Sequence, residues 1–415
     1  MEEKIQRFAA KLSGQRHLLA LRDGMAASLP LVIIGSFFML ISNFPSETVV
    51  NWLDSYGLVD MLNNASDSTF GIVGIVVTFT IAYNLGRSYS VDPLSSGMFS
   101  LASYILITPR LATDAGTGFP SQYLGTGGMF VGIIVAIVTT EIFKFFLQKD
   151  ITIKMPDSVP PNVSKAFTAI IPGALAIMVW MVVLAILSAL GVSNIHDLVS
   201  NVIAKPLTMI TGTLPGIIIV TLTQSFFWFF GIHGAQLTGP FIEPLLFIAS
   251  DENRLALQAG QEAPNIITYE FLYNFVFPGG AGALISLAIL LFFFSRSGAN
   301  SALGKLSIMP TIFQIPESII FGFPTILNPS ILIPFALTPV VNSIMVYTAM
   351  NLGWVAKPIG AIVPWTTPPI LAGFLATGGH ISGAIMNIVS ILVGMAIYYP
   401  FFRADDKMKL QREKL

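Results

Sequence analysis

Long apolar stretches separated by short polar connections make up most of this chain. A window of about 19 residues, the length that crosses the hydrocarbon core of a bilayer, finds nine continuous apolar segments. Each of them predicts a membrane-spanning helix. They lie near residues 26–44, 70–86, 94–109, 128–148, 166–190, 214–232, 273–295, 331–351 and 380–400.

Three further apolar segments are shorter and are interrupted by Gly and Pro. They lie near residues 239–250, 308–327 and 357–376. Non-helical backbone survives at membrane depth only where protein or a water-filled cavity satisfies its polar groups. Such interrupted segments therefore indicate the region where a solute binds.

The distribution of Lys and Arg predicts the orientation of the chain. Residues 1–25 carry five of these cations and are typical of an amphipathic helix on the cytoplasmic surface, not of a signal peptide, because no small-residue cleavage site follows. The 149–165 connection and the 403–415 tail are also basic, whereas 45–69 is acidic and has neither Lys nor Arg. Both termini are therefore expected in the cytoplasm, which requires an even number of crossings.

These patterns predict an all-α polytopic membrane protein with about ten transmembrane helices and two re-entrant hairpins. The apolar segments of the first half are continuous, whereas those of the second half are interrupted and carry most of the polar residues. We therefore expect the first half to make packing or subunit contacts and the second half to handle a solute. The predicted regions are an interfacial helix at 1–25, a membrane domain for packing or subunit contacts at 26–190, which the family resemblance described below makes a dimer interface, an amphipathic connector at 191–213, a substrate-binding transport domain at 214–402 and a cytoplasmic tail at 403–415.

Composition agrees with a membrane protein and excludes several function classes. The 415 residues are 54% hydrophobic and 10% charged, against about 25% charged in an average soluble domain. A net charge of −1 provides no basic footprint for nucleic acid. The lack of cysteine excludes disulfides and thiolate metal sites. No HExxH, Walker A or GxGxxG motif is present, so neither a metal nor a cofactor is expected.

One carboxylate is a strong candidate for chemistry. The sequence IFQIPESIIFGFPTILNP (312–329) places Glu317 after Pro316, in an apolar stretch without a cation. An ionised carboxylate there costs about 2.5–3.5 kcal/mol on insertion scales, so it should face a cavity and either pair or be protonated. It could instead cap the positive end of a short half-helix. We favour a functional role, because Ser or Asn would cap nearly as well.

His233 is the second candidate and lies in FWFFGIHGAQLTGPFIEP (227–244). A lone histidine at a helix end is more often a satisfied core residue than a ligand. Here two glycines open the backbone on both sides and two glutamines add amide groups, which favours binding. These neighbours are Gly231, Gly234, Gln224 and Gln236. Glu243 of the same stretch is equally compatible with an interfacial position and with a site.

Tryptophans add an aromatic candidate. Trp365 lies in the Pro-rich sequence IVPWTTPPI, where an indole face can be held rigidly and can stack on the C–H face of a sugar ring. Trp228 could belong either to the site or to the interfacial belt of aromatic residues, which explains Trp52 and Trp354 well. Two other histidines are not expected to have a chemical role. His196 is expected to be solvated in the connector, and His380 to cap the last span.

Four stretches of sequence are informative as a set. They are QRHLLALRDGMAASLPLVIIGSFFMLI (15–41), LSSGMFSLASYILITP (94–109), FFGIHG (229–234) and IPESIIFGFPTILNP (315–329). Together they resemble enzyme IIC, the membrane component of the bacterial phosphoenolpyruvate-dependent sugar phosphotransferase system. The likeness is greatest to its lactose, cellobiose and diacetylchitobiose branch, and it runs over nearly the whole chain.

The resemblance implies a homodimer in the bacterial plasma membrane, with ten spans and two re-entrant hairpins per subunit. It also implies transport of a disaccharide coupled to phosphorylation of its 6-hydroxyl by a cytoplasmic IIB protein that carries phosphate on cysteine. Because this chain has no cysteine and no room for a second domain, IIB is expected to be a separate protein. No catalysis is then expected from this chain alone.

The resemblance also implies roles for individual residues. His233 and Glu317 are expected to contact the sugar near the hydroxyl that is phosphorylated, with Glu317 as the base or orienting group. Trp365 is expected to stack on the sugar. The remaining expected sugar contacts are Trp228, Gln236, Gly234 and Asn328.

Two other functions use the same residues. In an ion-coupled sugar permease, Glu317 and His233 would bind a proton instead of orienting a hydroxyl. In a membrane glycosyltransferase or another intramembrane enzyme, the pair would act on a bound substrate. Dependence of uptake on phosphoenolpyruvate or on a proton gradient separates these functions.

Overall fold

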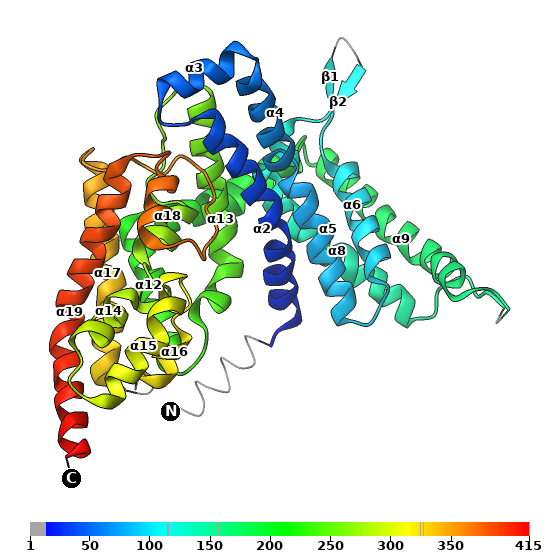
Figure 1. The fold of residues 1–415 in the computed structure, drawn as a ribbon. Helices are drawn as coiled ribbons and strands as arrows, with labels where there is room; N and C mark the ends of the chain where they lie inside the picture. Colours follow the sequence, from blue (N-terminus) through cyan, green and yellow to red (C-terminus); the bar gives the residue numbers. More distant parts are fainter. Residues whose placement is uncertain (1–13, 114–115, 157, 324, 327, 415) are drawn as a thin grey trace. The chain divides into compact units, whose positions relative to one another are not determined.

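The computed structural model describes residues 14–414 apart from 114–115, 157, 324 and 327. These residues are almost entirely helical, as expected for an all-α membrane protein (Figure 1). A two-stranded antiparallel hairpin is the exception, with β1 (Leu111–Thr113) paired to β2 (Gly116–Gly118). Residues 1–13, about half of the predicted interfacial helix at 1–25, lie outside the described part of the chain.

The chain forms two compact units. The first unit comprises residues 14–35 and 67–208, and the second comprises 36–66 and 209–414. One boundary between the units falls at residue 209, residues 36–66 belong to the second unit, and residues 191–208 belong to the first. The roles expected for these regions, subunit contact and transport, stay predictions.

The first unit is built mainly from helices. Asp92 caps one of them by accepting from the Ser95 amide at 2.9 Å, with Pro93 in the first turn, a combination that favours helix initiation. The helices after α2 (Arg16–Ser42) are α5 (Val73–Ser88), α6 (Pro93–Ile107), α7 (Ser121–Leu124), η1 (Thr126–Gly128), α8 (Met129–Gln148), α9 (Pro161–Ala189), α10 (Ile195–Val199), η2 (Ser200–Ala204) and α11 (Lys205–Thr211).

The second unit contains more interrupted backbone. Helix α19 runs alongside α14 and α17, and their buried apolar side chains form a core with Trp228 (Figure 1). The elements are α3 (Glu47–Ser55), α4 (Leu58–Phe70), α12 (Leu214–Phe229), α13 (Gly234–Gln258), η3 (Phe271–Val276), η4 (Ala281–Ala283), α14 (Ile285–Phe294), α15 (Gly298–Ile312), α16 (Glu317–Gly322), α17 (Pro329–Asn351), α18 (Pro369–Ala376) and α19 (Ile381–Glu413).

Six helices of the described residues are long and apolar enough to cross a membrane, or up to eight if each of two bent pairs counts as one span. The bent pairs are Ile195–Thr211 with Leu214–Phe229, at 82°, and Phe271–Ala283 with Ile285–Phe294, at 55°. The polytopic class is thus confirmed. Each bent pair has the form of a broken span or a re-entrant loop.

Two predicted segments are corrected by the structure. The segment at 273–295 is not one continuous helix, because left-handed glycines bend it, including Gly280 with φ of +82°. The segment at 239–250 is not irregular and instead forms part of the 25-residue helix α13. Residues 16–25 form the first turns of α2, and residues 403–413 continue helix α19.

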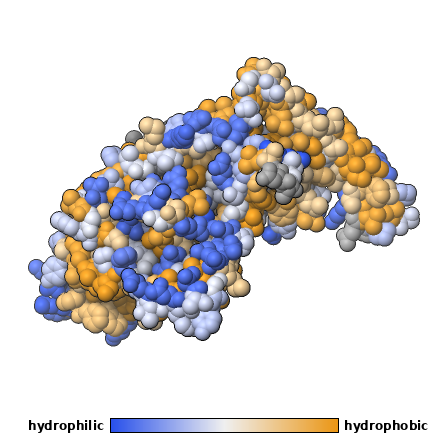
Figure 2. Space-filling view, turned by 90° about the horizontal axis from the view of Figure 1, so that it is seen from above, coloured by the Kyte–Doolittle hydropathy of each residue, from blue (hydrophilic) through white to orange (hydrophobic). Residues whose placement is uncertain are grey.

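The surface also fits a membrane protein. Hydrophobic residues cover much of the face shown in Figure 2. Exposed apolar side chains follow one another along α9, including Met178, Met181, Val182 and Ile186, each more than half exposed. Such a run of exposed apolar residues is costly in water and is stable in contact with lipid or another apolar surface.

Candidate functional site

The His233 motif connects α12 to α13 through a tight turn. Gly231 in this turn has φ of +76°, a conformation that glycine adopts without strain. His233 is the N-cap of α13, and its Nδ1 accepts from the backbone N–H of Gln236 at 3.2 Å. This contact places the proton of a neutral imidazole on Nε2, which can donate to a sugar oxygen.

Close packing between α12 and α13 holds this histidine. A Cβ at Gly234 would lie 2.2 Å from the carbonyl oxygen of Gln224, so only glycine allows the two backbones to approach. The Gln224 side chain donates to the hydroxyl of Thr238 at 2.9 Å. The indole of Trp228 is 4% exposed and lies 4.6 Å, between ring centroids, from the imidazole of His233. Trp228 therefore supports the histidine ring from the core side.

The Glu317 motif forms a six-residue helix, α16, which follows the non-helical residues 313–316. Helix α16 begins at Glu317, and Pro316 is its N-cap residue. One carboxylate oxygen of Glu317, Oε2, is buried without a hydrogen-bond partner. Buried polar atoms normally have a partner. An unpartnered carboxylate oxygen is therefore well suited to accept a hydrogen bond from a ligand hydroxyl.

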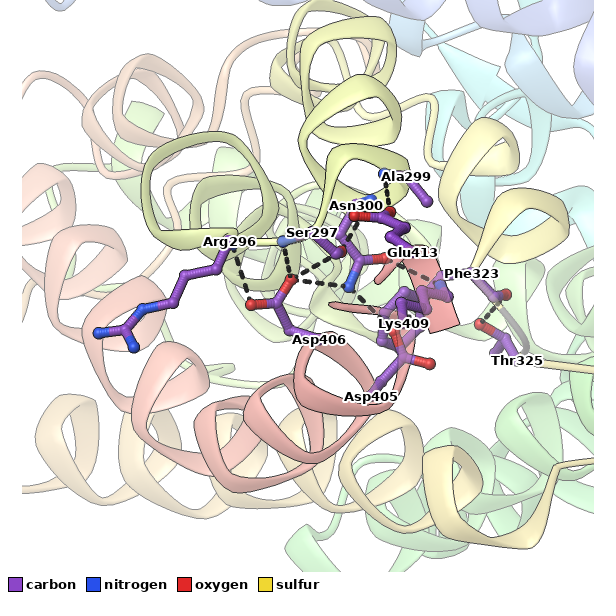
Figure 3. Close-up of polar contacts among 10 residues, drawn as sticks. All are labelled: Arg296, Ser297, Ala299, Asn300, Phe323, Thr325, Asp405, Asp406, Lys409 and Glu413. Carbon is purple, nitrogen blue, oxygen red and sulfur yellow. Dashed lines mark hydrogen bonds and ion pairs between the residues drawn. The ribbon is translucent and has the colours of Figure 1, made fainter. Parts of the chain in front are cut away.

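The C-terminal turns of α19 anchor the helix that leads into this motif. Asp406 accepts hydrogen bonds from the amides of Arg296 and Ser297 at 2.9 and 3.1 Å, at the start of α15 (Figure 3). Glu413 accepts from the next two amides, both at 2.9 Å. These carboxylates satisfy the first amides of the helix and favour its positive end.

The C-terminal turns of α19 also contact the Glu317 motif itself. Lys409 donates to the Asn300 side chain at 2.8 Å and pairs with Asp405 at 3.0 Å (Figure 3). Its ammonium also lies 4.9 Å from the ring centroid of Phe323, just after α16. The start of α15 and the end of the Glu317 motif are thus both tied to α19.

Trp365 lies in a turn before α18. The amide of Thr367 donates to the carbonyl of Pro364 at 2.9 Å, which closes the turn around Trp365. The indole is 48% exposed, whereas Ile362 just before the turn is buried and its amide donates to the Ser36 hydroxyl at 2.8 Å. The backbone just before Trp365 is therefore held in the core, whereas the indole face of Trp365 is accessible.

The structure brings the three motifs together within the second unit. A Cβ at Gly231 in the His233 turn would meet the side chain of Ile326, which follows α16, at 3.6 Å. Gln314 in the Glu317 motif donates to the carbonyl of Thr367, in the Trp365 turn, at 3.3 Å. Segments that are far apart in the sequence are therefore neighbours, as a single site requires.

The other predicted contacts have defined surroundings. Gln236 is exposed at the first turn of α13. Asn328 caps α17, and its side-chain oxygen accepts from the Ser330 amide at 3.1 Å. Glu243 accepts from the hydroxyl of Tyr273 at 2.8 Å, so it lies in a hydrogen-bonded position within the second unit. The sugar-binding roles of these residues stay predictions.

Two predictions about histidines are wrong in part. His196 is not solvated, because it is only 2% exposed and stacks on the Tyr123 ring at 4.5 Å. The Thr108 hydroxyl lies 3.1 Å from its Nε2. The polar sequence around His196 suggests a solvated position, but the short helix α10 packs on α6 and α8 and buries the side chain. His380 does occupy the N-cap of α19, but its side chain makes no capping bond.

The sequence reasoning missed a group of buried polar residues around η3. Glu270 is fully buried, and one of its oxygens accepts from the Ser250 hydroxyl at 2.7 Å. Asn274, one turn later, is also fully buried. In the sequence, these buried polar residues are indicated only by the carboxylate of Glu270 and the amide of Asn274 at the edge of an apolar segment. Within the described ranges, no group of three or more His, Cys, Asp or Glu side chains could hold a metal ion.

Comparison with known proteins agrees with this architecture. Residues 22–339 match the family model of the phosphotransferase system EIIC. The chain is 39% identical, with a TM-score of 0.95, to the crystal structure of the transporter ChbC, the IIC component from the N,N'-diacetylchitobiose-specific phosphotransferase system. That match covers 100% of this chain and 99% of ChbC.

Similar proteins with curated names belong to the same system. The lichenan permease IIC component of Bacillus subtilis is 43% identical, over 100% of this chain and 94% of that protein. The cellobiose-specific EIIC component of Geobacillus stearothermophilus is 42% identical, over 100% of this chain and 95% of that protein. The lactose-specific EIICB component of Streptococcus mutans is 32% identical, over 99% of this chain and 73% of that protein. This chain therefore belongs to the EIIC family of the phosphotransferase system.

Proposed function

We propose that this protein is a disaccharide permease whose transport is coupled to phosphorylation of the sugar. The substrate class is that of disaccharides such as cellobiose, diacetylchitobiose or lactose. Similarity to proteins named for lichenan, cellobiose, lactose and diacetylchitobiose supports this class. The observation that carries the proposal is the convergence of the His233, Glu317 and Trp365 segments within one unit.

The chemistry of these residues fits a sugar. An accessible indole can cover the C–H face of a pyranose ring, while imidazole and carboxylate groups bond its hydroxyls. Glu317 has a buried oxygen without a partner and can accept the hydrogen of the 6-hydroxyl. Accepting that hydrogen raises the nucleophilicity of the sugar oxygen as it attacks phosphorus. His233 donates from Nε2 to a neighbouring sugar oxygen and fixes the orientation.

The phosphate comes from a separate IIB protein that carries it on cysteine. This chain has no cysteine, so it supplies the sugar and its orientation but not the phosphoryl donor. In the transfer, the bond between phosphorus and the cysteine sulfur of IIB breaks, a bond forms between phosphorus and the sugar oxygen, and the hydroxyl proton passes to Glu317. One similar protein has a name that combines the IIC and IIB components, which supports such a pairing.

The proposed setting is the bacterial plasma membrane, with both termini in the cytoplasm and two copies forming a homodimer. The basic 149–165 connection supports this orientation. Cysteine accessibility in a chain that has no native cysteine tests it directly. Labelling of a terminal cysteine from the outside of intact cells would contradict the orientation.

Uptake into membrane vesicles tests the function. Vesicles that contain the protein should accumulate labelled disaccharide phosphate only when phosphoenolpyruvate, the soluble phosphotransferase proteins and IIB are supplied. Uptake of unmodified sugar driven by an imposed proton gradient would contradict the proposal and indicate an ion-coupled permease. Thermal stabilisation of the purified protein across a panel of disaccharides then identifies the substrate.

A further inference from the structure

Gln314 adopts a backbone conformation that normally favours glycine. It follows the end of α15, three residues before Glu317, with φ of +68°. Its amide donates to the Thr311 carbonyl, and the Ile315 amide donates to the Pro310 carbonyl, both at 3.0 Å. This is the Schellman pattern that ends many helices, and its left-handed residue is usually glycine because a side chain there crowds the backbone.

The side chain of Gln314 explains why glutamine is suited to this position. It is only 6% exposed, and both ends of its amide bond to other segments. Its Oε1 accepts from the backbone N–H of Gly280 at 2.8 Å, and its Nε2 donates to the carbonyl of Thr367 at 3.3 Å. One side chain thus joins the segment before Glu317 to two other breaks in helical structure.

The contact with Gly280 fixes the backbone that leads to the carboxylate. Gly280 has φ of +82°, and a Cβ at this position would lie 2.7 Å from both the carbonyl oxygen of Gln314 and a ring carbon of Pro316. The turn between η3 and α14 therefore packs directly on the residue before Glu317. The hydrogen bond that the Gly280 N–H donates to the side-chain oxygen of Gln314 holds this close approach in register.

The contact with Thr367 holds the aromatic side of the site. Thr367 closes the turn that contains Trp365. Because Gln314 donates to the carbonyl of that same residue, a displacement of the Trp365 turn relative to the Glu317 segment would break the bond. The two groups proposed to bind opposite features of the sugar, its ring face and its hydroxyl, are thus linked through one buried amide.

We infer that Gln314 is a positioning residue, which sets the Glu317 carboxyl and the Trp365 indole at a fixed spacing for a single bound sugar. This inference rests on the proposed function and deepens it. Gln314 touches neither the sugar nor the phosphate in this role. It acts through the backbone on both sides of the site, and the unfavourable left-handed conformation is offset by bonds that glycine cannot make.

Two substitutions separate the side chain from the backbone conformation. Gln314→Met keeps the length and the strained φ but removes both hydrogen bonds. Gln314→Gly removes the bonds and also relieves the strain, so it should fold at least as well as the Met variant. Ser90→Gly is the matched control, because Ser90 ends α5 with the same pattern and φ of +58° but is exposed.

The experiment compares these variants with the wild-type full-length chain in vesicles and after purification. Both Gln314 variants should lose about 10²-fold in IIB-dependent phosphotransfer at saturating sugar, because small misplacements of reacting groups have effects of that size. The Kd for cellobiose should rise by less than about tenfold. Ser90→Gly should match wild type. Trp365→Ala should weaken cellobiose binding less in the Gln314→Met background than in wild type, because the indole is already displaced.

Normal phosphotransfer per folded molecule in both Gln314 variants would overturn the inference, even if their melting temperatures fall, since that result means a structural role only. Strict additivity of Gln314→Met and Trp365→Ala in cellobiose affinity would also overturn it. If the wild-type protein itself shows no phosphotransfer, the proposed function fails, and the affinity cycle alone then decides the role of Gln314.

Discussion

The two units stabilise their helices in different ways. In the first unit, glycines let helices pack at close range: a Cβ at Gly74 would lie 2.4 Å from the carbonyl oxygen of Gly125, and one at Gly132 would lie 2.3 Å from the Thr78 hydroxyl. In the second unit, polar side chains bond to backbone groups where helices stop.

Asn253 shows how the second unit does this. It is fully buried, and its side-chain N–H groups donate to the carbonyls of Asn265 and Pro358 at 2.8 and 2.7 Å. Its oxygen accepts from the Asn265 amide at 2.8 Å. Gln314 joins its own segment to two others in the same manner. Irregular backbone in an apolar setting needs such partners, because water cannot supply them.

The difference supports the proposal that the second unit binds the solute. Continuous helices satisfy their backbone groups internally and offer few of them to a polar solute. Interrupted helices expose backbone and side-chain polar groups that can be shared between the protein and a ligand. Substitutions in the first unit should therefore change stability alone, whereas matched substitutions in the second unit should also change binding or phosphotransfer.

The largest expected effect comes from Glu317→Gln. Phosphotransfer should fall by about 10²–10⁴-fold, the usual loss when a positioned acid–base group is removed. Sugar affinity should be largely kept, because the amide is nearly isosteric and still accepts a hydrogen bond. Rapid-quench assays with phosphorylated IIB measure the rate, and calorimetry measures the affinity. Near-normal phosphotransfer would remove Glu317 from its assigned role.

A matched pair of glycines tests the comparison itself. Gly74→Ala and Gly234→Ala each place a Cβ less than 3 Å from backbone atoms, at 2.4 and 2.2 Å respectively. Each should lower the free energy of unfolding by about 1–3 kcal/mol through overpacking. Only Gly234→Ala should also weaken sugar binding, because it displaces the adjacent His233. Equal affinity in the two folded variants would argue against the functional division between the units.

His233→Ala should weaken sugar binding by about 1–3 kcal/mol, since it leaves a buried polar group of the sugar without a partner. His233→Asn should retain part of the affinity, because its amide can both cap α13 and donate. Calorimetric titration of both variants with the best disaccharide measures the difference. Unchanged binding in His233→Ala would return this histidine to a purely structural role as a helix cap.

The smallest expected effect is that of Trp365→Phe. A smaller aromatic face keeps part of the stacking area, so binding should weaken less than in Trp365→Ala. Trp52→Ala is the control, because Trp52 is 58% exposed and is expected in the interfacial belt. That control should affect stability or expression only. Equal affinity in wild type and all three variants would place Trp365 in the belt as well.

Much of this architecture could be predicted from the sequence because it depends on local patterns. Apolar segments of membrane length predicted α12, α17 and α19 close to their observed positions, since a helix satisfies all its backbone groups within one segment. The Gly and Pro pattern also predicted the breaks around Glu317 and Trp365. Sequence alone likewise determined that the chain has no thiol with which to carry phosphate.

Tertiary contacts decided what the local pattern left open. Helix α13 continues through Pro240 and Pro244, which are both buried, although prolines usually interrupt a helix. His196 is buried although its sequence is polar. In both cases packing against distant segments outweighs the local preference.

The site itself depends on such long-range packing. Nothing in the spacing of Gly280, Gln314 and Thr367 reveals that one amide joins them, because they are separated by 34 and 53 residues. The sequence therefore predicted which residues could bind a sugar, and that assignment stays a prediction. Only the fold placed their segments side by side, because the bonds that align them run between backbone breaks that a local pattern cannot pair.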